Sequence, residues 1–305
     1  RRFVLQPLAD SPVLQGRVLT GHRVLAVGRA GLLRSDLPGH PLRFERPFRL
    51  LVRGPQGDRY HEADAVLDAS GVYDRPNPLG LGGLPACGET ALGGGLIRYL
   101  GELDDRLSGL AGRRVLLIGH GHSAANALLM LQGLVADSPA THVTWATRSA
   151  HRRPCEEVAG DPLPQRRRIA SRANDLAQDP PGFLAVRRRT SVEALRRVEG
   201  RLAVTFTVGG RETFDAVVAM TGYRPDLSFL SELAIETSPV TQGGARLARA
   251  LADLRDCLAI PEVSPADLDS GEPGFHLIGS KAYGRARSFL IKTGLAQLDM
   301  IMERL

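Results

Sequence analysis

The sequence lacks the features that mark membrane, secreted or nucleic-acid-binding proteins. No apolar run approaches the roughly 18 residues that a membrane span needs, and none resembles the apolar core of a signal peptide. We therefore expect no membrane association and a cytoplasmic location. Aromatic residues make up only 5% of the chain, so the arginine clusters have no interleaved aromatic side chains on which bases could stack. We expect no nucleic-acid partner.

Cysteine is scarce. Cys87, Cys155 and Cys257 are far apart in the sequence and form no C-x-x-C pair. This spacing indicates neither a structural disulfide framework nor a zinc site, so no metal is expected. Each cysteine is interpreted as a small buried hydrophobic residue rather than as a redox centre.

Lysine is nearly absent, since Lys281 and Lys292 are the only two and almost all positive charge is arginine. The formal net charge of +6 permits an anionic ligand without requiring one. The basic clusters at 151–153, 166–168 and 187–189 are interpreted as solvated faces, with a contribution of the first cluster to phosphate binding.

The first quarter of the chain alternates short apolar runs with turns and contains no long amphipathic helix. Its expected strands are at 22–27, 48–54 and 64–71. Pro-Gln-Gly-Asp at 55–58 separates two strand-like runs and predicts a hairpin turn. Residues 1–75 therefore predict a small β-meander that leads into a buried strand. Proline and glycine then crowd residues 75–95, which is typical of a linker.

From Ala111 the pattern changes to strand, helix, strand. Residues 115–118 form a continuous apolar run, which suits a parallel strand covered on both faces. From Ala124 to Leu131, apolar residues recur at helical spacing and predict one buried helix face. Residues 151–180 are expected to be loop with short helices. Further strands are expected at 142–146, 202–208, 215–220 and 275–280, and an amphipathic helix at about 288–305.

A glycine-rich turn joins the apolar strand to this helix. Gly119-His120-Gly121-His122-Ser123-Ala124 fits the pattern G-x-G-x-x-A. The first glycine allows the tight turn, the second lets a pyrophosphate approach the backbone, and the small alanine lets helix and strand pack closely. The helix N-terminus offers free N–H groups and a partial positive charge to phosphates. Between a strand and an amphipathic helix, the motif predicts a dinucleotide site.

The end of the second strand indicates which nicotinamide cofactor is bound. An NAD site normally has Asp or Glu there, to bind the ribose hydroxyls. This chain instead has Arg148, with Arg152 and Arg153 close behind and no carboxylate. Guanidinium groups suit a 2′-phosphate, so NADPH is favoured. Exposed arginines without a ligand are the alternative.

A weak internal echo links two segments. Residues 64–76 and 215–225 both read Asp-Ala-Val, then a Ser or Thr followed by Gly, and shortly afterwards Arg-Pro. The echo suggests two related domains, each with a buried strand that stops at a Ser/Thr-Gly pair. A glycine there removes the side chain where backbone must pass close to a ligand or another strand. Chance similarity is the alternative.

In combination, four stretches resemble flavoproteins with two dinucleotide-binding domains, which include pyridine nucleotide-disulfide reductases and flavin-containing monooxygenases. They are DASG at 68–71, GHGHSA at 119–124, MTGYRPD at 220–226 and FHLIGSKAYGRARSFL at 275–290. The resemblance spans nearly the whole chain and implies an α/β fold. In that fold, a Rossmann-like NAD(P)-binding domain is inserted into an FAD-binding domain with a β-meander. FAD and NADP are the implied cofactors.

The implied domains follow the chain in order. They are a first, partial segment of the FAD-binding domain at 1–75, a linker at 76–110, the NADP-binding domain at 111–225, and the return of the FAD-binding domain at 226–305. The superfamily's first fingerprint, which holds the FAD pyrophosphate, has no match before Gly119, and the chain begins at Arg1 without methionine. We expect a fragment that has lost an upstream segment; compromised FAD binding is the alternative.

The resemblance also implies further cofactor-binding residues. Gly279 and Ser280 should approach the ribityl chain or pyrophosphate of FAD, and Arg285 should stabilise the reduced flavin's negative charge together with the last helix. That Arg285 and Lys281 are surface charges is the alternative. Two Ser/Thr-Gly pairs are expected at the domain junction, where the nicotinamide meets the flavin. These pairs are Ser70-Gly71 and Thr221-Gly222.

The expected activity is hydride transfer from NADPH to FAD, in a monooxygenase-like enzyme that acts on a small molecule. The cofactors supply the chemistry, so no catalytic side chain is nominated. The match within the superfamily is partial: this chain has no redox-active cysteine pair, and residues 91–99 lack the Phe and His of the monooxygenase motif. An NADPH-dependent reductase or electron transferase, and a non-catalytic nucleotide-binding module, are the alternatives. A homodimer is an open alternative for the assembly.

Overall fold

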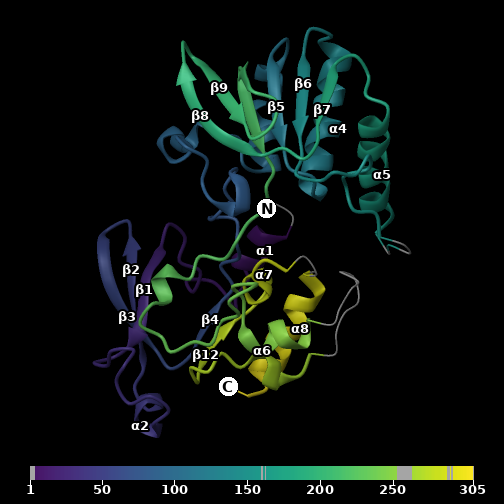
Figure 1. Ribbon diagram of the computed structural model, residues 1–305. Helices are drawn as coiled ribbons and strands as arrows, with labels where there is room; N and C mark the ends of the chain where they lie inside the picture. The colour runs from purple at the N-terminus through teal and green to yellow at the C-terminus, as the bar shows by residue number, and fades with distance from the viewer. Residues whose placement is uncertain are drawn as a thin grey trace. The chain divides into compact units, whose positions relative to one another are not determined.

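The computed structural model describes residues 4–158, 161, 163–252, 263–286, 289 and 291–304. The chain divides into two compact units. Unit 1 combines Arg1–Val72 with Pro225–Leu305, and unit 2 is Tyr73–Arg224. Because the chain leaves unit 1, builds unit 2 and then returns, unit 2 is an insertion in unit 1 (Figure 1).

Unit 2 is built on a parallel sheet of four strands in the order β11-β5-β6-β7. The strands are β5 (Arg114–Ile118), β6 (His142–Ala146), β7 (Leu184–Arg187) and β11 (Ala216–Ala219). Helix α4 (His122–Asp137) connects β5 to β6, and helix α5 (Pro164–Gln178) connects β6 to β7. This succession of strand and helix is the Rossmann-like pattern expected for a parallel sheet.

Three layers form unit 2, because both faces of the parallel sheet are covered. Val115 and Leu117 of β5 pack with the buried faces of α4 and α5. Leu116 and Ile118 point the other way and pack against an antiparallel sheet. That sheet has the order β10-β9-β8. Its strands are β8 (Val192–Val198), β9 (Arg201–Phe206) and β10 (Arg211–Phe214).

Residues 76–110, the expected linker, pack into unit 2. Leu96 and Leu103 are fully buried there. The Ile97 N–H donates to Val217 O (3.0 Å), which adds a short bridge to the edge of β11. The segment contains short helices rather than strands. They are η1 (Leu81–Gly83), η2 (Thr90–Gly95), α3 (Leu100–Arg106) and η3 (Leu107–Leu110).

Unit 1 contains the predicted β-meander, an antiparallel sheet of the strands β1 (Arg23–Arg29), β2 (Phe48–Gly54) and β3 (Gly57–Ala63). The expected hairpin turn joins β2 to β3. Beside it, β4 (Val66–Asp68) pairs in parallel with β12 (Phe275–Leu277), from the far end of the sequence. The helices are α1 (Leu5–Ala9), α2 (Pro41–Phe44), η4 (Ser228–Leu230), α6 (Ala245–Ala250), η5 (Pro265–Leu268), α7 (Ser280–Tyr283) and α8 (Ile291–Met302).

A buried ionic network joins the two chain segments of unit 1. The Glu272 carboxylate accepts hydrogen bonds from Arg29 Nε (2.9 Å), from Arg43 Nη2 (3.2 Å) and from the Ala234 N–H (2.8 Å). All three charged residues are at most 4% exposed. Burial alone would raise the pKa of Glu272, but these hydrogen bonds and the two positive charges outweigh it and lower the pKa.

The predicted fold class is confirmed: the chain is α/β, with a Rossmann-like unit inserted into a unit that contains a β-meander. The expectation of short helices at 151–180 was wrong, because residues 164–178 form the fifteen-residue helix α5. Its buried face consists of Ala170, Ala173, Asn174 and Ala177. Alanine gives little hydropathy contrast, so tertiary burial stabilises a helix that the apolar pattern did not reveal.

The last predicted helix is present as α8, while Ser288 and Leu305 lie outside the described residues. No described helix is long and apolar enough to cross a membrane.

Candidate nucleotide-binding site

The turn after β5 depends on a glycine whose backbone other residues cannot easily adopt. Gly119 has φ +120°, and a Cβ there would overlap the carbonyl oxygen of Met220 at the end of β11. The buried indole of Trp145 donates to Gly119 O at 2.7 Å and fixes the turn. Ala124 is fully buried, with its Cβ 3.6 Å from where a Gly119 Cβ would lie. A larger residue at position 124 would push α4 away from the turn.

Gly121 differs from Gly119, because space is open around it. Its φ of −83° is available to any residue, and a Cβ there would meet nothing within 4 Å. Gly121 is the N-cap of α4, where no side chain caps the helix and no acidic residue lies in the first turn. His122 and Ser123 follow, and neither side chain has a hydrogen-bond partner among the described residues. An uncapped helix N-terminus with open space before it can accept an anion.

His122, the first residue of α4, is exposed at this turn. Desolvation of the ring and then the positive charge of Arg166 lower its pKa, against an opposing effect of Asp161. Arg166 itself is held by Asp161 through hydrogen bonds of 2.7 Å and 3.0 Å. The imidazole is therefore neutral at pH 7 and adds little charge to the turn.

The loop after β6 is anchored to α5 by one of the predicted arginines. Arg153 pairs with Glu157 (2.8 Å) and with Asp175 of α5 (2.7 Å). The buried Asn174 side chain bonds both the N–H and the carbonyl of Cys155, at 2.8 Å and 2.9 Å. Arg153 is thus committed to holding the loop in place.

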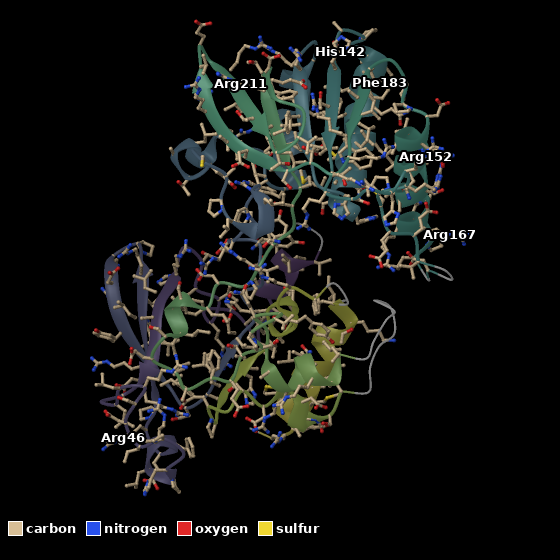
Figure 2. The ribbon with its side chains drawn as sticks, in the orientation of Figure 1. Arg46, His142, Arg152, Arg167, Phe183 and Arg211 are labelled. Atoms are coloured by element: carbon tan, nitrogen blue, oxygen red, sulfur yellow. The ribbon has the colours of Figure 1, made fainter. Side chains whose placement is uncertain are left out.

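Arg148 and Arg152 on the same loop are exposed, and their guanidinium groups have no hydrogen bond or ion pair with any described residue. Figure 2 shows Arg152 beside α5. At the end of β6 stands Thr147, which is 1% exposed, so no carboxylate occupies this position. Because β5 and β6 are adjacent parallel strands, their carboxyl ends bring the glycine turn and the arginine loop to one edge of the sheet.

The Thr221-Gly222 turn follows β11, next to the glycine turn. Gly222 has φ +79°. The Thr221 hydroxyl donates to Asn77 O at 2.6 Å, and Asn77 Nδ2 donates to the carbonyls of Thr221 and Tyr223. Burial raises the pKa of Tyr223 to about 12, and its hydroxyl donates to Arg98 O. These polar side chains therefore hold the turn in its conformation.

In unit 1, the Ser70-Gly71 turn follows β4 and lies beside Ser280. Gly71 has φ +73°, and a Cβ there would lie 3.4 Å from Ser280 Oγ. The Lys281 ammonium, 1% exposed, donates to Asp68 Oδ2 (2.9 Å) and to Ser70 Oγ (2.7 Å). Ser70 Oγ in turn donates to Asp68 Oδ1 (2.7 Å). The alternative that Lys281 is a surface charge is wrong, because its buried ammonium links the ends of β4 and β12.

Gly279 has φ +66°, and its N–H donates to Gln297 Oε1 of α8 at 3.0 Å. Gln297 is 1% exposed, and its Nε2 has no partner in the described structure. This buried amide N–H group beside Gly279 could donate a hydrogen bond to an acceptor atom of a ligand. Arg285 is exposed, and its Nε donates to Gln242 Oε1 (2.9 Å).

The cysteines differ from one another. Cys155 is buried, and desolvation followed by the charge of Glu157 raises its pKa to about 12, so the thiol is unreactive. Cys87 is exposed, against the expectation that each cysteine is buried. It lies in the segment that bridges to β8, and among the described residues only its backbone N–H and carbonyl are bonded. Cys257 lies outside the described residues.

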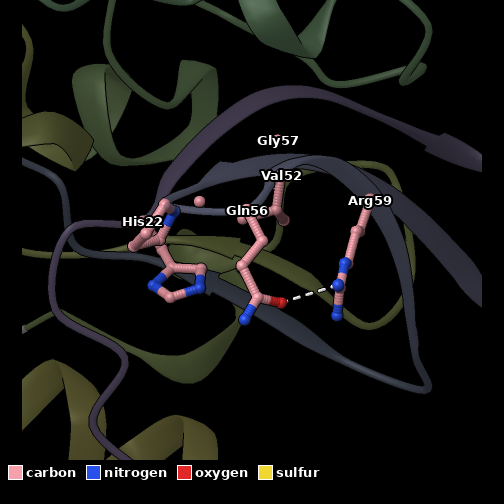
Figure 3. A pocket seen from close by; sticks show the side chains of 7 residues that line it. His22, Val52, Gln56, Gly57 and Arg59 are labelled. Atoms are coloured by element: carbon pink, nitrogen blue, oxygen red, sulfur yellow. Dashed lines mark hydrogen bonds between the residues drawn. The ribbon is translucent and has the colours of Figure 1, made fainter.

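A hollow of about 240 Å³ lies at the β2–β3 hairpin (Figure 3). His22, Gln56 and Arg59 line it, and Arg59 donates to Gln56 Oε1 at 2.7 Å. Hairpin residues make up most of its lining, and none of the predicted site residues is among them. The hollow is therefore separate from the candidate site.

No protein-family model matches the chain, and no curated protein sequence matches it. Solved structures do match. The bacillithiol disulfide reductase from Bacillus cereus is 22% identical with a TM-score of 0.62, over 93% of this chain and 70% of that one. The thioredoxin reductase from T. acidophilum is 16% identical with a TM-score of 0.55, over 93% and 74%.

The ornithine N-hydroxylase from Kutzneria sp. 744, in a complex with reduced FAD, NADP+ and L-ornithine, is 17% identical with a TM-score of 0.55 over 93% of this chain and 72% of that one. At these identities the comparison shows the fold. The chain shares the fold of these two reductases and of the N-hydroxylase, which is the fold that the sequence motifs predicted.

Proposed function

We propose that the protein is an FAD-dependent oxidoreductase that takes hydride from NADPH. The observation that carries this proposal is the combination, at one edge of the parallel sheet, of open space at Gly121 with the guanidinium groups of Arg148 and Arg152, which have no partner among the described residues. A pyrophosphate would lie against the N-terminus of α4, and the 2′-phosphate of NADPH would lie at the arginines. The absence of a carboxylate at Thr147 favours NADPH over NADH.

Each residue of the turn has a proposed part in binding. Gly119 fixes the backbone course, Gly121 leaves room for the phosphates, and Ala124 keeps α4 close to the sheet. The hydroxyl of Ser123, which has no partner in the part of the chain that the structure describes, and the backbone N–H groups of the first helical turn would donate to phosphate oxygens. His122 stands at the rim as a neutral side chain.

In unit 1, the residues present fit a second dinucleotide at the carboxyl ends of β4 and β12. Gly71 and Gly279 adopt left-handed backbone there, and the orphaned Nε2 of Gln297 offers a donor beside Gly279. Ser70, Gly71, Gly279 and Ser280 would hold FAD, which supplies the hydride-accepting ring when bound. The Lys281 network keeps the two turns together, and Arg285 would sit at the rim with its Gln242 partner. Thr221 and Gly222 would border the nicotinamide.

The finer activity that we propose is monooxygenation of a small molecule, in which the chain positions two cofactors and excludes water. The reductase alternative has its own support, because two of the three similar structures named above are disulfide reductases or thioredoxin reductases. A dithiol mechanism within the described residues has no support, since Cys155 is buried with a raised pKa and Cys87 stands alone.

The test begins with protein expressed from the complete reading frame and purified with its visible spectrum recorded. Under anaerobic conditions, NADPH should bleach the flavin absorbance, and NADH at the same concentration should do so much more slowly. A colourless protein that binds NADPH without oxidising it would contradict the oxidoreductase proposal and favour a nucleotide-binding module.

Admission of oxygen then separates the two finer activities. Oxygen uptake that yields an oxygenated product from a soft nucleophile, such as an amine or a thioether, would support the monooxygenase. NADPH oxidation that needs an added quinone or disulfide, with no oxygenated product, would support the reductase.

A further inference from the structure

Arginines gather where β6 and β7 end, and they differ in whether they have partners. Arg153 pairs with two carboxylates, and Arg187, the last residue of β7, pairs with Glu212. Arg188 donates to backbone carbonyls, including those of His151 and Arg152. Three exposed guanidinium groups have no partner among the described residues. They belong to Arg148, Arg152 and Arg189.

Arg189 comes from the loop between β7 and β8, yet its backbone is tied to the arginine loop after β6. Its N–H donates to Ser149 O at 3.2 Å, and the next N–H, of Thr190, donates to Thr147 O at 3.1 Å. Arg148 lies between these two acceptors in the sequence. The side chain of Arg188 also ties the two loops together, because it donates to the carbonyls of His151 and Arg152. The positions of Arg148 and Arg189 are thus fixed next to each other by backbone bonds.

The backbone of Arg189 is left-handed, with φ +53°. For a residue with a Cβ this conformation is disfavoured, and the surrounding hydrogen bonds must hold it. The result is an exposed cationic side chain on a loop that is hydrogen-bonded to the loop of Arg148 and Arg152, and none of these three guanidinium groups has a carboxylate partner among the described residues. Like charges brought together repel, and a doubly charged anion would relieve that repulsion.

We propose that Arg189 is the third guanidinium of the 2′-phosphate site and makes the protein prefer NADP over NAD. This inference rests on the proposed function and extends it to a residue on a different loop. Two guanidinium groups on one loop and a third from the neighbouring loop would surround the phosphate with charged hydrogen-bond donors from two sides. Contact with the adenine ring, by stacking of the guanidinium plane, is the competing role for the same side chain.

The experiment measures binding by isothermal titration calorimetry with two probes, 2′,5′-ADP and 5′-ADP, which differ only in the 2′-phosphate. The main variant is Arg189→Asn, because Asn accepts left-handed backbone better than most residues do. We expect its affinity for 2′,5′-ADP to fall about tenfold, the typical loss for one charge-assisted contact, while its affinity for 5′-ADP stays within about twofold. Arg189→Lys should recover part of the loss, because it restores the charge but not the fork.

Arg172→Ala is the matched control. Arg172 lies on α5 and, like Arg189, is an exposed arginine without a partner among the described residues. It should leave both affinities unchanged. Equal losses for the two probes in Arg189→Asn would overturn the proposal in favour of adenine contact. Unchanged binding in Arg189→Asn, or an equal loss in Arg172→Ala, would also overturn it.

Failure of this inference differs from failure of the proposed function. If the unaltered protein binds neither probe, the nucleotide site itself is absent. If it binds 2′,5′-ADP tightly and Arg189→Asn does so equally well, the site stands and only the role of Arg189 is wrong. Thermal melting of every variant establishes that it is folded before binding is compared.

Discussion

Two glycines of the turn after β5 should respond differently to the same substitution, Gly→Ala. At Gly119 the new Cβ would force a side-chain residue into φ +120° and would overlap Met220 O. The positive φ costs a residue with a Cβ about 1–2 kcal/mol, and the steric overlap costs about 1–3 kcal/mol. The free energy of unfolding should therefore decrease by about 2–5 kcal/mol. For a domain of this size, that corresponds to a decrease of roughly 5–15 °C in Tm.

At Gly121 the same methyl group meets nothing within 4 Å, and the backbone conformation is allowed for alanine. Replacement at an N-cap position should change stability by no more than about 1 kcal/mol. The methyl group would, however, stand where the pyrophosphate approaches, so the Kd for NADPH should rise about tenfold or more.

Differential scanning calorimetry of Gly119→Ala and Gly121→Ala, with calorimetric titration of NADPH into Gly121→Ala, tests both parts. The two variants are matched controls for each other, because they add the same atom two residues apart. Tight NADPH binding by a stable Gly121→Ala protein would refute the assignment of the phosphate position. An unchanged Tm for Gly119→Ala would refute the steric argument.

Three further predictions concern unit 1 and the thiols. Lys281→Met should destabilise the protein by about 3–5 kcal/mol, because Asp68 would stay buried without its cation. Urea unfolding measures this loss, and the double variant Lys281→Met/Asp68→Asn should recover part of it. Since the pKa of Glu272 is lowered in the folded state, its stabilisation is present above the usual pKa of about 4.3 and is lost as pH falls below it. The Tm of Glu272→Gln should therefore vary less between pH 5 and 3 than that of the unaltered protein, and parallel curves would contradict this. In a Cys257→Ser background, Ellman's reagent should label Cys87 rapidly and leave Cys155 unlabelled until denaturant is added.

Local sequence patterns were sufficient to predict the parts of the fold whose signal lies within one short segment. The apolar run that became β5, the glycine turn after it and the period of α4 each lie within a few residues. The hairpin between β2 and β3 was predictable for the same reason. In each case, the local turn chemistry and the tertiary packing favour the same structure. The structure of these segments could therefore be predicted without knowing which distant residues contact them.

Helix α5 was missed because its signal is tertiary. Its buried face is made of alanines and one asparagine, whose burial depends on α4 and on the loop that Asn174 holds. The buried state of Lys281 was missed for a related reason. Its partner Asp68 is 213 residues away in the sequence, and no local pattern reports a contact across that distance.

The candidate site divides in the same way. By itself, the sequence determined that a glycine-rich turn lies at residues 119–124 and that the next strand is followed by arginines instead of a carboxylate. Only the tertiary structure decided which arginines are paired, because Arg153 finds Glu157 on its own loop and Asp175 on α5, while Arg148, Arg152 and Arg189 find no carboxylate among the described residues. The physical reason is that the charge of a side chain is set by its residue type, whereas its neutralisation depends on neighbours that folding brings from other parts of the chain.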